Sequence, residues 1–403
     1  MNGTTYDCIV IGGGISGISF AHYMHTINKR VLIIEKDRNT GGRIQSLFSE
    51  QYPHYWREFG AHTCYNSYTR LLSIVKEIKR TDLIRPLGKG SYMTYSDGQI
   101  KKMFAEMSIP SLILNGPKIF FVSKNGKTVK EHFSRIVGAS NYNRLFSSLF
   151  RAVISQNADD YPAELFLKRR NNRYKEFPRK YTFKKGLSSF LDSIVENDNL
   201  QIEKSSEVTD IQHNRNGYRI TAEGKTFNAS NIAIATDPQT ASRLVKEMEA
   251  PLSALLASAP LFRSESLNVI VPKDKPATGN VAGIISVSGD FLSAVSRDLV
   301  EDEKLRSFTF HFENGKKDEG GKFDVVCKVL GISPSDILEW KTARHTLPSL
   351  RMPHLDMAGQ VETVKKSNDV YILGNYFYGL SMEDCVNRSF HEFERFRQRD
   401  MRK

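Results

Sequence analysis

The sequence predicts an α/β fold (α+β overall) in which segments from both ends of the chain join one parallel sheet. Three stretches of the 403 residues carry this prediction. "YDCIVIGGG" near the N-terminus and "NIAIAT" at 231–236 are short apolar runs rich in β-branched residues, which are typical of buried parallel strands. "YILGNYFYGLSMEDC" at 371–385 combines a third such strand with a glycine-containing turn and the start of a helix.

The first of these strands opens a strand–turn–helix unit. We expect the strand over Tyr6–Ile11, a helix from Ile15 to about Asn28, and a second strand over Arg30–Ile34. The glycine spacing GxGxxG falls between strand and helix. Its first glycine makes the tight turn, its second lets a pyrophosphate approach the backbone, and its third lets the helix pack closely on the strand. The amides at the helix N-terminus are then available to phosphate.

An acid, Glu35, follows the second strand, where a carboxylate can accept hydrogen bonds from the hydroxyls of a ribose. The strand, glycines, helix and acid together predict a Rossmann-like dinucleotide site. The residues predicted to form it are Gly12, Gly13, Gly14, Ile15, Ser16, Gly17, Glu35 and Lys36.

A second glycine pair follows in "TGGR" at 40–43. Gly42 offers another close approach of backbone to phosphate, and Arg43 adds a cation with a planar donor fork. With this addition, the chain resembles the flavoprotein superfamily that includes amine oxidases, protoporphyrinogen oxidases and phytoene desaturases. The resemblance implies a Rossmann-like domain of the glutathione-reductase/amine-oxidase type, an inserted helical and sheet substrate domain, and non-covalent FAD as the cofactor.

The resemblance also implies where the rest of FAD is held. The segment "REFGAHTCY" matches the family's approach to the flavin ring at Glu58, Phe59, Gly60 and Ala61, and Val208 matches the residue that contacts adenine. The C-terminal stretch matches at Gly374, Asn375, Ser381, Met382 and Glu383, where the helix amides are expected to face the flavin. "GLSMEDC" is most similar to the protoporphyrinogen oxidase version of this motif. Asn375 departs from the family, which often has an acid there.

No residue stands out as a catalytic base. His62, Arg344 and His345 are candidates for the substrate cavity, against the alternatives of a hydrogen-bonded histidine and a salt-bridged strand end. The four cysteines are far apart and form no CxxC pair, so we expect neither a metal site nor a disulfide framework.

The patterns predict three parts of the chain. Residues 1–85, 179–250 and 341–403 are expected to form the FAD-binding domain, 86–178 a helical substrate domain, and 251–340 a sheet that floors the substrate cavity.

Two stretches have several interpretations. Arg169–Lys185 holds eight basic residues against one acid, within a chain of net charge +12. Three interpretations are open: a solvated loop, a binding site for substrate carboxylates, or a patch that binds nucleic acid or anionic lipid.

Ser108–Val122 is apolar enough to be a core segment or to press against a membrane. The N-terminus lacks a signal-peptide pattern and no apolar window reaches 18 residues, so we expect a cytoplasmic protein with peripheral membrane contact still open.

The expected function is that of an FAD-dependent oxidoreductase resembling protoporphyrinogen oxidase. The sequence contains no second GxGxxG that would indicate a nicotinamide site. Hydride is therefore expected to pass to flavin N5 from an organic substrate, possibly one bearing carboxylates. The alternatives are a sugar isomerase resembling UDP-galactopyranose mutase and a non-enzymatic protein resembling the GDP-dissociation inhibitors. We expect no nucleic-acid partner, and the sequence predicts no oligomeric state.

Overall fold

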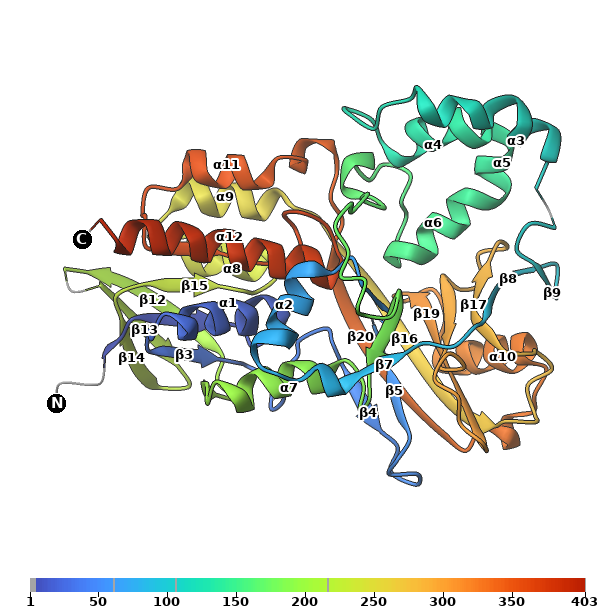
Figure 1. The fold of residues 1–403 in the computed structure, drawn as a ribbon, viewed down its shortest axis with the longest axis horizontal. Coiled ribbons are helices and arrows are strands. Elements are labelled where there is room, and N and C mark those ends of the chain that lie inside the picture. Colours follow the sequence, from blue (N-terminus) through green and yellow to red (C-terminus); the bar gives the residue numbers. More distant parts are fainter. Residues whose placement is uncertain (1–4, 61, 106, 216, 403) are drawn as a thin grey trace.

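The computed structural model describes residues 5–60, 62–105, 107–215 and 217–402. Ala61, one of the predicted cofactor contacts, lies outside the described residues. Figure 1 shows two sheets at opposite ends of the molecule, with a group of helices beside one of them.

A five-stranded parallel sheet joins the two ends of the chain. Its order is β11–β3–β2–β15–β21, and every neighbouring pair is parallel. The strands are β2 (Cys8–Ile11), β3 (Val31–Ile34), β11 (Gln201–Glu203), β15 (Ile232–Ile234) and β21 (Val370–Ile372). The three strands predicted from the opening, middle and closing stretches are therefore present, with β15 between the other two.

Layers of other elements bury both faces of this sheet. Cys8 and Val10 of β2 face α1 (Ile15–Thr26), α2 (Thr69–Glu77), α7 (Ser188–Asn197) and α12 (Met382–Asp400). Ile9 and Ile11 face the opposite layer. That layer contains the meander β12 (Val208–Asn214), β13 (Gly217–Ala222) and β14 (Lys225–Ala229), with β1 (Thr5–Tyr6), and the helices α8 (Pro238–Val245), α9 (Ala250–Ser258) and α11 (Met357–Val364). Burial on both faces explains why these strands read as continuous apolar runs.

A seven-stranded sheet forms the other end of the molecule (Figure 1). Its order is β20–β16–β19–β18–β17–β8–β9. The strands are β8 (Ser91–Ser96), β9 (Gln99–Lys102), β16 (Leu261–Pro272), β17 (Val281–Ser286), β18 (Ser293–Ser296), β19 (Leu305–Glu313) and β20 (Glu339–Pro348). One face is apolar and packs on α10 (Glu319–Leu330), as Phe308 and Phe310 do. Ser307, Thr309 and His311 alternate with these phenylalanines along β19 and are buried on the other face.

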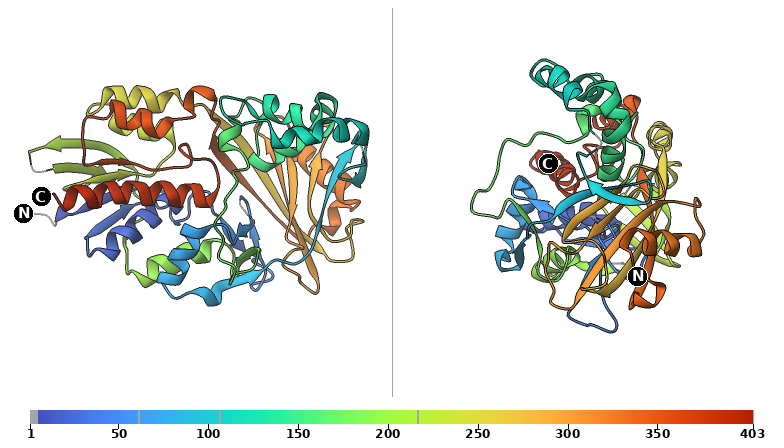
Figure 2. Two further views of the ribbon diagram at one scale, coloured as in Figure 1. Left: turned by 45° about the horizontal axis from the view of Figure 1, so that its top comes forward. Right: turned by 90° about the vertical axis from the view of Figure 1, so that its right-hand side faces the viewer.

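A helical lobe lies beside this second sheet (Figures 1 and 2). It contains α3 (Ile109–Asn115), η2 (Gly116–Phe120), α4 (Val129–Val137), α5 (Ala139–Asn141), the π-helical η3 (Tyr142–Phe146) and α6 (Ser147–Ile154). The segment 86–178 therefore contains the whole lobe together with strands β8 and β9, and β20 crosses residue 340. The three-part division of the chain stays a prediction.

Short elements connect these parts. They are the pair β4 (Ser46–Phe48) and β5 (Trp56–Glu58), the small sheet of β6 (Cys64–Tyr65), β10 (Lys180–Phe183) and β7 (Ile84–Pro86), and the single turns η1 (Thr81–Leu83), η4 (Ala163–Leu165), η5 (Pro334–Asp336) and η6 (Met352–His354). Within the described residues, no helix is both long and apolar enough to cross a membrane.

Candidate functional site

The first glycine turn has the close contacts that the sequence predicts for it. Gly12 has φ +107°, and a Cβ there would lie 2.7 Å from the carbonyl oxygen of Ala235 on the neighbouring strand. A Cβ on Gly17 would overlap the carbonyl oxygen of Gly12. Gly14 caps α1 without any side-chain hydrogen bond. The first amides of α1, which have no partner within the helix, are thus left for an anion.

The second glycine pair adjoins the first. The Gly41 amide donates to the Gly13 carbonyl at 2.8 Å, and Gly14 and Gly41 form a parallel bridge. Arg43 follows on this loop. Burial lowers the pKa of Arg43 and nearby Asp237 raises it, yet Arg43 forms no ion pair with any described residue. Arg43 is thus a partly enclosed cation with no ion-pair partner among the described residues, and it lies beside two glycine turns, an arrangement that fits a pyrophosphate.

Glu35, the residue predicted to bind the ribose, lies beside the first glycine turn. Its Oε2 accepts the Gly13 amide at 2.6 Å and its Oε1 accepts the Asp37 amide at 2.8 Å. Each carboxylate oxygen has a second lone pair, so ribose hydroxyls can still bind. The Ser206 amide donates to the Glu35 carbonyl at 2.9 Å, which brings the start of β12, and with it Val208, near Glu35. The side chain of Lys36 is exposed.

The segment predicted to reach the flavin ring connects the two sheets. Thr309 Oγ1 donates to the Glu58 carbonyl at 2.7 Å, and Ser266 Oγ donates to the Phe59 carbonyl at 3.3 Å. Gly60 lies against the second glycine loop, since a Cβ there would sit 2.9 Å from the Arg43 carbonyl oxygen. Hydrogen bonds to two strands of the second sheet therefore hold this segment in place.

The side chain of Glu58 is buried between the two sheets. Ser46 Oγ lies 2.8 Å from both of its oxygens, and the Leu187 amide donates to Oε1 at 2.7 Å. Burial raises the pKa of Glu58 to about 8, although these hydrogen bonds lower it. Glu58 is thus mainly a neutral acid at pH 7.

The turn between β21 and α12 begins at a glycine whose backbone conformation other residues rarely adopt. Gly374 has φ +147°, and a Cβ there would overlap the ring of Tyr376. Asn375 is partly exposed, and Met382 is buried at the first position of α12. Ser381 caps this helix by accepting the Asp384 amide at 3.2 Å and donating to Asp384 Oδ2 at 2.6 Å.

The side chain of Glu383 binds another helix, and its predicted cofactor contact through the backbone amide stays a prediction. Its carboxylate accepts the backbone amides of Arg70 at 2.9 Å and Leu71 at 3.1 Å, in the first turn of α2. Burial raises the pKa of Glu383 to about 7. The side chain therefore stabilises the N-terminus of α2, and only the backbone of Glu383 remains available to a cofactor.

Most basic side chains of the stretch Arg169–Lys185 are exposed on the surface. Arg169, Arg173 and Lys175 are exposed, and Arg170 donates to Asp384 Oδ1 at 3.0 Å and to Ser381 Oγ at 2.9 Å. Arg170 thus stabilises the start of α12, and no residue of the stretch lines the hollow described next.

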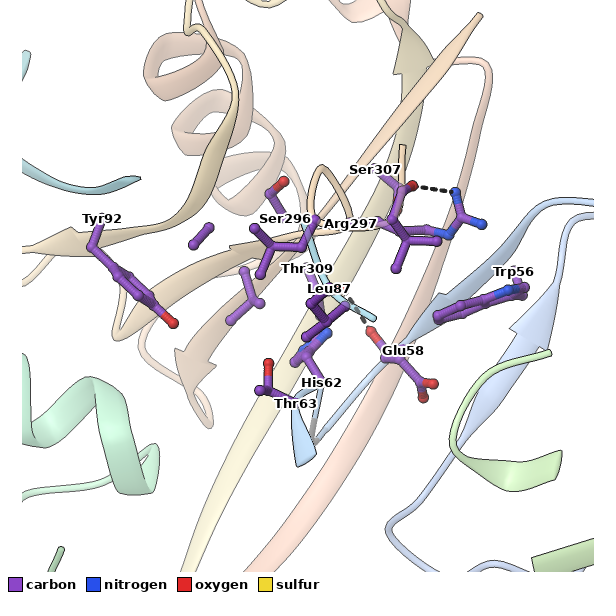
Figure 3. A pocket seen from close by; sticks show the side chains of 14 residues that line it. Trp56, Glu58, His62, Thr63, Leu87, Tyr92, Ser296, Arg297, Ser307 and Thr309 are labelled. Carbon is purple, nitrogen blue, oxygen red and sulfur yellow. Dashed lines mark hydrogen bonds between the residues drawn. The ribbon is translucent and has the colours of Figure 1, made fainter. Parts of the chain in front are cut away.

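A small hollow, partly open to solvent, lies between Glu58 and the polar face of the second sheet (Figure 3). Its lining is mixed: Trp56, Tyr92 and several aliphatic side chains face Arg297, Glu58 and His62. His62 Nε2 is enclosed and has no hydrogen-bond partner among the described residues. Burial lowers the pKa of His62 to about 4, so its ring is neutral at pH 7.

Two further histidines lie behind His62. Ser266 Oγ is 2.8 Å from His311 Nδ1 and 2.9 Å from His345 Nε2, and the rings of His62 and His311 are 6.4 Å apart. Burial lowers the pKa of His311 to about 3 and that of His345 to about 4. His62 and His345 are thus brought together, whereas the neighbouring Arg344 is 87% exposed and pairs with Glu265 outside.

The sequence analysis missed His311 and Arg297. The alternation in "SFTFHFE" at 307–313 was a usable signal for His311, because every second residue is a phenylalanine and the residues between are polar. Arg297 had no comparable signal.

These residues fit FAD. The uncapped amides of α1, the acid Glu35 and the cation of Arg43, which has no ion-pair partner among the described residues, suit a dinucleotide. The Glu58–Gly60 segment and the start of α12 are the parts predicted to hold the ring. The sequence profile of the flavin-containing amine oxidoreductases matches residues 15–271. The chain belongs to this family, and it is an FAD-dependent oxidoreductase that acts on a small molecule.

Solved structures with the same fold cover almost the whole chain. A protein from Exiguobacterium assigned as a protoporphyrinogen oxidase has 12% identity and a TM-score of 0.80, over 99% of this chain and 100% of that one. Cyclohexylamine oxidase from Brevibacterium oxydans has 15% identity and a TM-score of 0.72, over 98% and 100%. A UDP-galactopyranose mutase from Mycoplasma genitalium is 28% identical over 75 residues, which span only 19% of each chain. Membership of an enzyme family argues against the non-enzymatic alternative.

Proposed function

We propose that the protein is an oxidase or dehydrogenase, similar to protoporphyrinogen oxidase, that removes a hydride from a largely apolar small molecule bearing a carboxylate. The chemistry that bound FAD supplies is acceptance of the hydride at flavin N5, with reoxidation by oxygen or another acceptor. The proposal rests on the environment of Arg297.

Arg297 is a cation that lines the hollow without an acidic partner. It forms no ion pair with any described residue, and its Nε has no hydrogen-bond partner there. Its guanidinium lies 4.0 Å from the ring centre of Tyr55 and 4.6 Å from that of Trp56, which holds its plane in position. Burial lowers the pKa of Arg297, but arginine keeps its charge in proteins. A substrate carboxylate would satisfy this charge with a forked hydrogen bond.

The other lining residues suit the body of such a substrate. Leu87, Tyr92 and Val295 offer an apolar surface, and Glu58 and His62 contribute neutral polar groups. A neutral His62 can accept the proton that a neighbouring nitrogen, oxygen or carbon atom loses as the double bond to the oxidised carbon forms. A neutral Glu58 places no negative charge against the ring as electrons arrive.

The test is the kinetics of Arg297→Gln. Loss of a hydrogen bond to a charged group costs about 1.5–3 kcal/mol, or roughly 10- to 150-fold, so KM for a carboxylate substrate should rise by that factor. The methyl ester of the same substrate should show no change between wild type and variant. Arg263→Gln, an exposed arginine on the same sheet, is the matched control. An equal loss of activity toward acid and ester would refute the role of Arg297.

A second candidate is a sugar isomerase like UDP-galactopyranose mutase, favoured by the 75-residue match. Incubating dithionite-reduced holoenzyme with UDP-galactofuranose distinguishes the two. Isomerisation would favour this candidate, and an unchanged sugar nucleotide would favour the oxidase.

A further inference from the structure

We propose that the outer part of the helical lobe, residues 104–105 and 107–121, is a docking surface for an anionic lipid bilayer. We call this segment the apolar tip. Seven of its large apolar side chains are between 55% and 86% exposed: Phe104, Ile109, Ile113, Leu114, Ile119, Phe120 and Phe121.

The rest of the protein does not cover the apolar tip. Neither α3 nor η2 contains a buried residue. Leu112 is the side chain of α3 that packs on the core, and it is only partly buried. Phe120 and Phe121 are 84% and 86% exposed. Single exposed apolar residues are common on protein surfaces, but a run of seven marks an interaction site.

The charges around the tip select an anionic partner. From Phe104 to Lys130 the sequence has four lysines and one acid, Glu106, which lies outside the described residues. Lys118 donates to Asn115 Oδ1, Lys124 to the carbonyls of Phe166 and Leu167, and Lys127 to the Ser123 carbonyl. All of these acceptors are neutral, and none of the three lysines pairs with an acid in the described part of the chain. Their positive charge therefore remains available.

Apolar side chains together with lysines fit a bilayer better than a protein. Lysine is depleted from protein–protein interfaces. Segments that lie in the membrane interface combine Phe and Leu on one side with Lys or Arg, which attract anionic headgroups. Phe120 is the last residue of η2 and Phe121 follows it, and both side chains are exposed enough to enter a headgroup layer. Figure 1 shows α3 at the outer edge of the lobe, away from the five-stranded sheet, so docking leaves the predicted cofactor site uncovered.

The experiment is vesicle flotation of the FAD-loaded full chain. The vesicles are phosphatidylcholine alone, or phosphatidylcholine with roughly one-quarter phosphatidylserine. The variant Ile113→Ser/Phe120→Ser/Phe121→Ser removes exposed apolar side chains only, and retained flavin absorbance checks its fold. The matched control is Phe48→Ser/Val153→Ser/Met401→Ser, which removes three exposed apolar side chains elsewhere.

Wild type and control should float with the anionic vesicles, and the tip variant should bind at least roughly tenfold more weakly. Lys118→Gln/Lys127→Gln should lose binding to anionic vesicles, and added salt should weaken wild-type binding. The proposal is overturned if the wild type does not float, or if the tip variant floats equally well. It is also overturned if light scattering shows a wild-type dimer that the tip variant converts to a monomer, because the tip would then be an interface between copies.

Discussion

Glu35 uses one carboxylate to hold two loops, because its oxygens accept the amides of Gly13 and Asp37. This contact keeps the first glycine turn beside the end of β3 even before a ribose binds. The predicted cofactor contact is thus also a support for the turn that is predicted to receive the pyrophosphate.

Glu35→Ala should therefore weaken FAD binding by about 1–3 kcal/mol, roughly 5- to 150-fold in Kd. Titration of FAD into apoprotein, followed by flavin fluorescence, measures this change. Arg38→Ala, an exposed change on the same loop, should leave Kd unaltered. If Glu35→Ala bound FAD as tightly as wild type, the ribose end of the site would be wrongly assigned.

At the residue scale, motif positions were predictable where the backbone has one demanding geometry. Gly12, Gly17 and Gly374 have contacts that exclude a side chain. Side chains whose partners come from distant segments were not predictable. Glu383 binds α2, over 300 residues earlier, and Arg297 is defined by its contacts with Tyr55 and Trp56. No local pattern encodes either pairing.

Among the helices, α1, α2 and α7 meet at a buried histidine. His22 Nδ1 lies 2.7 Å from Asp198 Oδ2, just after α7, and His22 Nε2 lies 2.9 Å from Glu77 Oε2 at the end of α2. Burial lowers the pKa of His22, but the hydrogen bonds and charges of the two acids outweigh it and raise the pKa to about 9, from an ordinary 6.5.

This pair of acids makes the packing of the three helices pH-dependent. Because the folded pKa exceeds the unfolded one, protonated His22 stabilises the fold fully below pH 6.5, and this contribution disappears as pH rises through 9. The shift corresponds to on the order of 3 kcal/mol. His22→Gln should lower the free energy of unfolding most at pH 6, and the gap from wild type should narrow toward pH 9.5.

Urea unfolding of both proteins across that range measures the gap. His25→Gln, which changes an exposed histidine on the same helix, is the control and should show little effect. A gap that stays constant with pH would mean that His22 is not charged in the fold.

Elements with local signals were predicted, and those that depend on distant pairing were not. The parallel strands were recognisable because burial on both faces makes them continuously apolar. Strand β8 pairs in parallel with β17, nearly 190 residues later in the chain, and its own sequence, "SYMTYS", is too short and polar to indicate this. Helix α10 contains Gly320 and Gly321, which disfavour a helix, but Asp318 caps it and Val326 and Leu330 pack on the second sheet.

At the scale of the whole molecule, the cofactor cradle contains segments from the start, middle and end of the chain. Bound FAD contacts the folded arrangement only, so it should stabilise the protein by mass action. At 100 times Kd the gain is about 2.7 kcal/mol. Thermal unfolding of apoprotein and of FAD-loaded protein, followed by circular dichroism, should give a higher Tm with FAD. An equal Tm would indicate that the cradle does not depend on its ligand.

The most direct test of the proposed function is the absorption spectrum of the purified holoenzyme during anaerobic addition of substrate. Protoporphyrinogen, which carries carboxylates on a largely apolar body, should bleach the flavin bands, its methyl ester should do so only at higher concentration, and Arg297→Gln should abolish this preference. Bleaching by a neutral amine but not by any carboxylate would contradict the assigned substrate class. A protein that stays colourless after incubation with FAD would contradict the account of the site as a whole.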